Sequence, residues 1–431
     1  MLENVVRGLH PFGVPSLLMT RSRWSSTTGY CLAALRAAIG SVTRQLPKKD
    51  RLRYEQTKPS RIRAGIIVCI VLGCLTIPFS SLAKSEKHGK DDGPILSQPL
   101  SIAWRYTTDQ TTDLTPAADA QTVFVPLSSG VLLALNASDG KLDWKADAGG
   151  VFSAIPVVDD RSVYMAQRYG ERSQPPVGGT LRALSKTTGV TLWTRTLQVA
   201  VSAGLAVDGT AVFAASGDGT VYAFDKRTGL VLWSCQYPEE FTAQPAVAGN
   251  NVYFSSKSGT VRALNVKTGE LAWQYKTGGP VLGSVAVFDD VVYIGSGDGN
   301  VYAFSEPRKK VLWQRRTGAA VQAVTVVPNG VLASSLDNFA YLLSLNKGSL
   351  VWRRQLPGRI SSRPITAADA ALFTPFSTDQ AIVLNLHDGK TANTLPLGEE
   401  NSSSAAAVAV NNLVLITIPH GLLAFSSTTQ K

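Results

Sequence analysis

The chain has 431 residues, of which 44% are hydrophobic and 17% are charged, and its formal net charge is +11. The charge is uneven: residues 1–93 hold 15 Lys and Arg against 6 Asp and Glu, whereas residues 94–431 hold 27 against 25. Nucleic-acid-binding domains present a concentrated basic surface, so the near-neutral part of the chain argues against a nucleic-acid partner.

Residues 1–63 are a basic amino-terminal region that is too long for the basic start of an ordinary signal peptide. We expect either a disordered tail or a translation start placed too early. The stretch from Tyr30 to Val42 is apolar, but it is too short and too interrupted to span a membrane.

Residues 64–83 form an uncharged apolar run, whose length matches the span of about 20 residues that a membrane-crossing helix needs. Five basic residues precede it, namely Arg51, Arg53, Lys58, Arg61 and Arg63. The positive-inside rule therefore places the amino-terminal side in the cytoplasm and the rest of the chain outside it.

Three fates of this segment share that geometry, and the pattern leaves all of them open. Ser81-Leu82-Ala83 resembles a signal-peptidase site, and Val71-Leu72-Gly73-Cys74 resembles a lipobox in which Cys74 is the candidate lipidation site, although leucine before the glycine is atypical. The third fate is retention as an anchor. Residues 84–100 are polar with Gly and Pro, which predicts a linker.

A tryptophan then recurs at intervals of about forty positions, with one longer interval between the second and third members. The series is Trp104, Trp144, Trp193, Trp233, Trp273, Trp313 and Trp352. A fixed period of this length indicates a repeat architecture. Ten residues separate an alanine from the tryptophan in five copies, as from Ala223 to Trp233.

A turn glycine stands four residues before most of these tryptophans, as Gly229 does before Trp233. Glycine suits a hairpin position with positive φ. Alternating, β-branched stretches such as Val212-Phe213-Ala214 precede each copy, so one repeat holds about four short strands. Four antiparallel strands per repeat describe a propeller blade.

The repeats predict an all-β fold over residues 101–426, an eight-bladed β-propeller with four-stranded antiparallel blades. The last repeat ends near Phe425 without room for its own outer strand, whereas Ser101–Tyr106 precedes the first blade without a partner. We therefore expect this amino-terminal strand to complete the eighth blade and close the ring, which removes exposed edges.

The tryptophans are most simply interpreted as wedges between neighbouring blades, each burying a large aromatic area. The alternative is an aromatic binding row. Two blades are irregular, because Asn393 replaces the tryptophan in the seventh and an insertion, Arg168 to Val177, interrupts the second. Such irregularities are candidate partner sites, or they reflect drift.

Residues with catalytic or metal-binding chemistry are sparse. Asn136, Asp139 and Asp143 lack the dense oxygen pattern of a calcium loop, and turn capping by Asp139 explains them better. Gly217-Asp218-Gly219 and Gly297-Asp298-Gly299 connect strands, so hairpin turns explain them better than phosphate loops. The propeller histidines, His387 and His420, lie far apart in the sequence, each near a turn. We expect no catalytic, cofactor or metal site.

The cysteines and the basic residues of the propeller also give no indication of a catalytic, cofactor or metal site. Of Cys31, Cys69, Cys74 and Cys235, only the last lies in the propeller, so the domain has no internal disulfide. The cluster Arg308-Lys309-Lys310 with Arg315-Arg316 is expected to be a solvated outer edge.

The repeat Ala-(Leu/Phe)-(Asp/Asn)-x-x-Thr-Gly-x-x-x-Trp, as in Ala223 to Trp233, resembles the pyrroloquinoline-quinone (PQQ) type of propeller repeat over residues 101–425. One branch, the quinoprotein alcohol dehydrogenases, implies PQQ, calcium, an adjacent-cysteine disulfide and an aspartate base. This chain has no adjacent cysteine pair and no ligand set that matches. The other branch, similar to the BamB family of outer-membrane assembly factors, implies a compact exported scaffold without cofactor.

The resemblance therefore implies a non-catalytic, periplasmic or membrane-anchored scaffold that binds protein partners, among them the outer-membrane β-barrel assembly machinery. Two alternatives stay open: a general ligand- or protein-binding propeller of the cell envelope, and a PQQ-dependent dehydrogenase. The sequence does not indicate which residues bind protein.

Overall fold

The computed structural model describes residues 95–427, apart from residues 112, 170–177, 368 and 399–401. The chain divides into two units, Met1–Lys87 and His88–Lys431. Several segments discussed above lie outside the described residues: residues 1–63, the apolar segment 64–83 with Cys74, the linker up to residue 94, and most of the insertion at 168–177. Within the described residues, no helix is long and apolar enough to cross a membrane.

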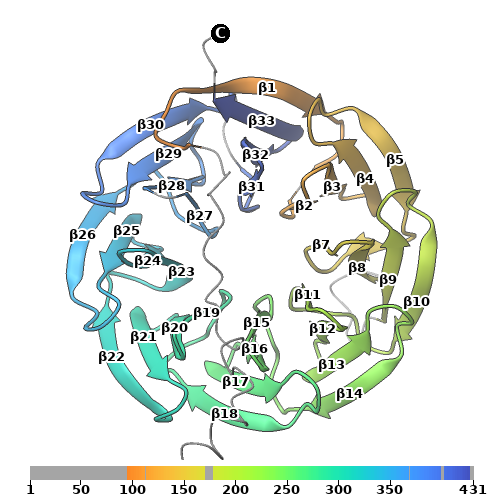
Figure 1. The fold of residues 1–431 in the computed structure, drawn as a ribbon, viewed down its shortest axis with the longest axis horizontal. Helices are drawn as coiled ribbons and strands as arrows, with labels where there is room; N and C mark the ends of the chain where they lie inside the picture. The colour runs from red at the N-terminus through yellow and green to blue at the C-terminus, as the bar shows by residue number, and fades with distance from the viewer. Residues whose placement is uncertain (1–94, 112, 170–177, 368, 399–401, 428–431) are drawn as a thin grey trace, which may run out of the picture. The chain divides into compact units, whose positions relative to one another are not determined.

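The described strands form eight antiparallel sheets arranged radially around a central channel (Figure 1), which confirms the eight-bladed propeller. Blades 1 to 4 comprise β2 (Ala117–Ala118), β3 (Thr122–Pro126), β4 (Val131–Asn136) and β5 (Leu142–Asp147); β6 (Val151–Phe152), β7 (Val157–Val158), β8 (Ser162–Arg168), β9 (Gly179–Ser185) and β10 (Thr191–Leu197); β11 (Ala206–Val207), β12 (Ala211–Ala215), β13 (Thr220–Asp225) and β14 (Val231–Gln236); and β15 (Ala246–Ala248), β16 (Asn251–Ser255), β17 (Thr260–Asn265) and β18 (Leu271–Lys276).

Blades 5 to 8 comprise β19 (Ala286–Phe288), β20 (Val291–Gly295), β21 (Asn300–Ser305) and β22 (Lys310–Arg316); β23 (Val321–Val327), β24 (Gly330–Ser335), β25 (Phe339–Leu343) and β26 (Leu350–Gln355); β27 (Ile365–Thr366), β28 (Ala370–Phe373), β29 (Gln380–Asn385) and β30 (Thr391–Pro396); and β31 (Val408–Val410), β32 (Leu413–Ile418), β33 (Gly421–Ser427) and β1 (Leu100–Thr107). The innermost strands are β2, β7, β11, β15, β19, β23, β27 and β31, and the last strand given for each blade lies on the rim (Figure 1).

The eighth blade joins the two ends of the described chain. Its strand order is β1-β33-β32-β31, and β1 pairs antiparallel with β33, with Trp104 opposite Ala424. The predicted closure by the amino-terminal strand is confirmed. Closure in this way gives the eighth blade an outer strand, so the edge of β33 is covered.

The tryptophans lie between blades, as predicted. Six of the seven are only 6–8% exposed, and Trp144 is half-buried. Trp193, for example, packs in one core cluster with Tyr164 of its own blade and with Val212 and Phe224 of the next. The wedge interpretation is confirmed for the six buried rings, since a ligand-binding row needs exposed ring faces.

Each wedge is also held by a hydrogen bond across the blade interface. At six of the seven interfaces that contain a tryptophan, the indole Nε1 donates to a backbone carbonyl in the next blade's outer turn, for example from Trp193 to Lys226 at 3.0 Å and from Trp233 to Val266 at 3.0 Å. The turn glycine of the next blade lies against the ring itself: a Cβ on Gly229 would stand 2.6 Å from two ring carbons of Trp193. The φ of Gly229 is +68°. The motif's glycine and tryptophan are therefore partners between blades.

Blades 4 and 5 depart from this arrangement. The residue at the turn-glycine position is Lys309, with φ of +49°, and Trp273 Nε1 donates to the Glu306 side chain at 2.7 Å instead of to a carbonyl. The same Oε1 accepts from the Tyr253 hydroxyl at 2.8 Å and from Asn251 at 3.1 Å. One carboxylate therefore gathers three donors across this interface.

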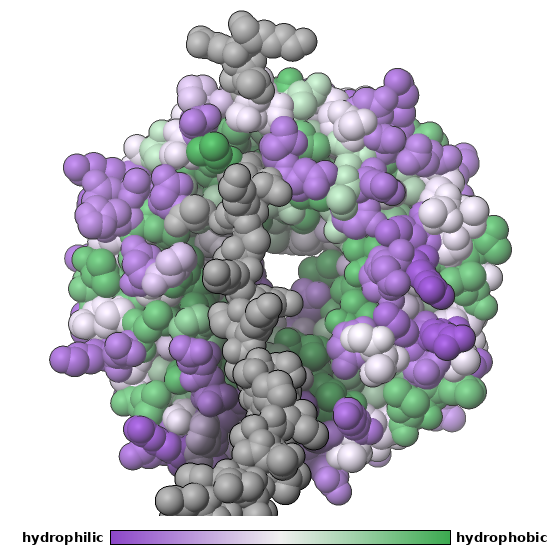
Figure 2. Space-filling model, in the orientation of Figure 1, coloured by the Kyte–Doolittle hydropathy of each residue, from purple (hydrophilic) through white to green (hydrophobic). Residues whose placement is uncertain are grey.

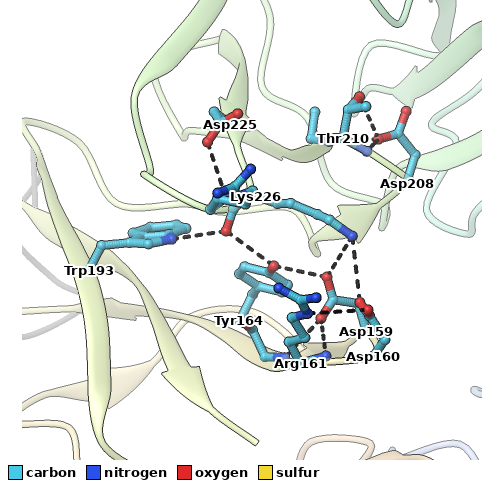
Figure 3. Close-up of polar contacts among 12 residues, drawn as sticks. Asp159, Asp160, Arg161, Tyr164, Trp193, Asp208, Thr210, Asp225 and Lys226 are labelled. Carbon is cyan, nitrogen blue, oxygen red and sulfur yellow. Dashed lines mark hydrogen bonds and ion pairs between the residues drawn. The ribbon is translucent and has the colours of Figure 1, made fainter.

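An ion pair adds to the contact between blades 2 and 3 (Figure 3). Lys226 Nζ lies 3.0 Å from Asp159 and 3.7 Å from Asp160, while its carbonyl accepts from both Trp193 and Tyr164. The Lys226 and Asp159 side chains are 20% and 11% exposed, so solvent screens this pair less than a surface pair.

The seam between blades 7 and 8 lacks a tryptophan. Asn393 takes its place, and its Nδ2 donates to the Gln98 carbonyl at 2.7 Å and to the Leu96 carbonyl at 3.4 Å. Leu96 is fully buried in a core cluster with Val383 of blade 7 and Phe425 of blade 8. This irregularity therefore binds the chain's own amino-terminal segment.

Candidate binding surfaces

The turn residues weighed as ligand sites have local structural roles. Asn136 accepts from the Ser138 N–H at 2.9 Å, and Asp139 accepts from the Lys141 N–H at 3.1 Å and forms an ion pair with its Nζ. Asp143 lies nearby on β5. Turn capping by Asp139 is confirmed.

The two Gly-Asp-Gly stretches are hairpin turns, as expected. Asp218 accepts from the Thr220 N–H at 3.0 Å within the β12–β13 turn. Asp298 accepts from the Asn300 N–H at 2.9 Å, and also from the Tyr302 hydroxyl and from the Gly278 N–H. In both turns the aspartate organises protein groups.

His387 and His420 are exposed, on the turn after β29 and on the turn between β32 and β33. Among the residues that the structure describes, no three His, Cys, Asp or Glu side chains gather so that they could hold a metal ion. Cys235, on β14, is half-buried and forms no disulfide.

The basic cluster lies on the rim, as the sequence indicated. Arg308, Lys309 and Lys310 are exposed on the turn before and at the start of β22, and Arg315 and Arg316 are exposed at its end. They form the solvated outer edge of blade 5.

Exposed apolar side chains recur on the outer strands of blades 1 to 6, among them Leu142 of β5 and Val351 of β26, and one group of six lies on the rim of blades 2 to 4. It comprises Val190 and Leu192 on or beside β10, Leu230, Val231 and Leu232 on or beside β14, and Leu271 on β18, each 46–63% exposed. We call these six residues the outer apolar patch. The three outer strands are neighbours around the ring (Figure 1). Large exposed apolar patches mark interaction sites.

The outer strand β14 is the centre of this patch and has an unguarded edge. Edge strands are usually protected by charges. The outer strands β22 and β26 carry several arginines, whereas β14, Val-Leu-Trp-Ser-Cys-Gln, carries no charged residue. The outer strand β30 is also uncharged, but its exposed residues include threonines and a proline. Next to β14, Arg195 of β10 donates from Nε to the Gly229 carbonyl, so its guanidinium is held in place.

A second candidate surface is the channel wall. A cavity of about 720 Å³ opens along blades 4 to 6, lined largely by Ala and Val of β15, β19 and β23, with Phe288 at the end of β19. Figure 2 shows the opening through the ring, with hydrophobic residues along part of its margin. Arg363, before β27, is the charged residue of the lining.

The sequence profile of the family described as outer membrane protein assembly factor BamB matches residues 98–174, 177–284 and 277–430. The chain belongs to the BamB family. No curated protein matches it.

Several solved structures have the same fold. BamB from Moraxella catarrhalis is 19% identical, with a TM-score of 0.64 over 77% of this chain and 99% of that one. The computationally designed Ika8 protein is 17% identical, with a TM-score of 0.65 over 75% and 99%. A quinohemoprotein alcohol dehydrogenase from Comamonas testosteroni is 12% identical, with a TM-score of 0.61 over 78% and 77%. These likenesses show the fold.

The residues that line the cavity in the channel wall do not fit PQQ with calcium. PQQ carries several carboxylates and calcium needs oxygen ligands, whereas the cavity lining has one cation, Arg363, and no acidic residue. The chain also has no adjacent cysteine pair.

Proposed function

We propose that this protein is a non-catalytic, exported scaffold that binds protein partners during outer-membrane β-barrel assembly, as the BamB family name implies. The observation that carries the binding role is the outer apolar patch. Six large apolar side chains are exposed on neighbouring outer strands. Export and retention at the envelope belong to the same proposal and depend on residues 64–83 and Cys74.

The patch has the features of a protein-binding surface. Burying its side chains would contribute roughly 25 cal/mol per Å² of apolar surface removed from water. The uncharged β14 edge also leaves backbone N–H and C=O groups that a partner strand could pair with. Recognition would then combine apolar contact with backbone pairing.

Affinity capture from solubilised envelopes tests this proposal with a matched pair of variants. Leu232→Asp places a charge in the patch, and Leu312→Asp places it at the equivalent rim position of blade 5, where the leucine is 39% exposed. We expect wild type and Leu312→Asp to recover barrel-assembly components and Leu232→Asp to lose them. Consistent failure of the folded wild type to recover such components would overturn the assembly role.

Equal capture by the two variants would show that the partner binds elsewhere on the ring. A separate assay addresses the enzyme alternative: the protein mixed with PQQ and calcium should show no dye-linked alcohol oxidation. Mass spectrometry of the mature amino terminus distinguishes cleavage, lipid on Cys74 and retention of residues 64–83.

A further inference from the structure

Most of the side chains that line the cavity in the channel wall are apolar, and Gln244, Ser284 and Arg363 are the polar ones. The cavity is lined by side chains from three adjacent inner strands, among them Ala246, Val247, Val287, Phe288, Val326 and Val327. Phe288 is 46% exposed, although a phenylalanine ring is usually buried. About 720 Å³ is within the range of small-molecule sites.

Arg363 is the exception among eight equivalent positions around the channel. Arg363 stands two positions before Ile365, which pairs with Leu372 of the second strand. The strand register aligns the other blades with blade 7 and gives Arg363 one equivalent residue in each of them. These seven residues are uncharged, namely Thr115, Ile155, Gly204, Gln244, Ser284, Ala323 and Ala406. The eighth is Arg363. The repeat itself therefore does not require an arginine here.

The guanidinium is oriented but not neutralised. Its Nε donates to Oγ1 of Thr325, on β23 of the neighbouring blade 6, at 3.1 Å. Its two terminal nitrogens have no hydrogen-bond or ion-pair partner among the described residues, and no acidic residue lines the cavity. The residue opens to solvent through the channel, but protein atoms crowd around it, and this partial burial lowers the pKa of Arg363.

We propose that this cavity binds a ligand with an apolar body and a single carboxylate, the body lying against β15, β19 and β23 and the carboxylate pairing with the terminal nitrogens of Arg363. Arginine holds carboxylates through two parallel N–H···O bonds, and with Nε on Thr325 the terminal nitrogens can supply such donors. A fatty acid and an apolar peptide with a free carboxyl terminus both present this chemistry.

Calorimetric titration of the purified protein tests the proposal with two pairs of probes. Decanoate is compared with decanol, and a tetrapeptide of leucine and phenylalanine with a free carboxyl terminus is compared with its amidated form. We expect at least one carboxylate to bind about tenfold more tightly than its neutral counterpart. The pair that shows the preference identifies the source of the carboxylate.

Three variants locate the site. Arg363→Gln should reduce carboxylate affinity about tenfold or more. Arg359 is exposed, lies four residues earlier and does not line the cavity, so Arg359→Gln should leave the affinity unchanged. Phe288→Ala should weaken carboxylate and neutral probes alike, since it removes apolar contact. Both target residues open to the channel, so the fold should be unaffected.

The proposal is overturned if neither carboxylate binds, if decanol and the amidated peptide bind as tightly as the acids, or if Arg363→Gln binds as wild type does. The ligand proposal and the scaffold role can fail separately. Leu232 lies on the rim, so Leu232→Asp should leave the titration unchanged, and Arg363→Gln should leave partner capture unchanged.

Discussion

Gly229 of blade 3 lies against the indole of Trp193 of blade 2, with no room for a side chain between them. The glycine has a φ of +68°, and an added Cβ would lie 2.6 Å from Cδ2 and Cε3 of the ring. Six of the seven tryptophans meet a turn glycine in this way, with Trp273 the exception. The repeat therefore encodes contacts between blades as well as turns within them.

Gly229→Ala should destabilise the protein by about 2–5 kcal/mol, because positive φ and steric overlap act together. The matched control is Gly249→Ala, where φ is +56° but nothing lies within 4 Å of the added Cβ. That variant should lose only about 1 kcal/mol. Denaturant unfolding of both variants measures the difference, and equal losses would show that ring contact at Gly229 is unimportant.

Lys309→Gly should stabilise the protein by about 1 kcal/mol, an unusual direction for a substitution in a folded domain. Lys309 adopts a φ of +49° at the position where other blades carry glycine. Lys310→Gly, one residue later at the start of β22, should instead cost about 0.5–1 kcal/mol. Thermal unfolding of the two variants should therefore shift in opposite directions.

Leu96→Ala should weaken the seam between blades 7 and 8. The leucine is fully buried there, so its truncation should cost about 2–5 kcal/mol. Ile95→Ala is the control, because Ile95 is 51% exposed. Hydrogen exchange should show faster exchange in β1 and β33 for Leu96→Ala only.

Deleting residues 98–108 should lower the melting temperature of the protein further than Leu96→Ala does, because the deletion removes β1. An unchanged melting temperature would contradict closure by β1.

Acid should weaken the contact between blades 2 and 3. Burial raises the pKa of Asp159, but hydrogen bonds from the Arg161 and Ser162 N–H groups and from Lys226 outweigh burial and leave the pKa below its usual value. The stabilisation is therefore complete above the ordinary Asp pKa of about 3.9 and is lost as pH falls through the lower folded value.

The stability difference between wild type and Asp159→Asn should accordingly be largest near neutral pH and shrink below about pH 3.9. Asp160→Asn is the control, since Asp160 is 72% exposed and lies 3.7 Å from Lys226. Thermal unfolding across this pH range measures both. A constant difference for Asp159→Asn would show that its charge does not stabilise the interface.

Regular spacing made the fold predictable. The number of blades, the closing strand and the wedge role of residues such as Trp193 follow from positions that repeat along the chain. Glu306 was not predictable, because its side chain takes over a hydrogen bond that other blades make with the backbone. Asn393 was noticed as an irregularity, but its partner Leu96 lies 297 residues away.

The candidate binding surfaces could be predicted less well from the sequence. Leu230-Val231-Leu232 is visible as an apolar triplet after a turn glycine, yet only its place on the rim shows that it is exposed. Arg363 precedes a proline in an unremarkable loop. Arg363 stands out only when it is compared with the seven uncharged residues at the equivalent position of the other blades, and only the strand register identifies those residues.

The eighth blade combines the first and last strands of the described chain, which stand at opposite ends of the propeller sequence. A chain delivered amino-terminus first must keep Leu100–Thr107 unpaired until β33 arrives, because its pairing partner is the last of the described strands. Assembly of the ring is then a single late event. Any chain cut short before residue 421 should remain an open arc, with β1 and the flank of blade 7 free to associate with other molecules.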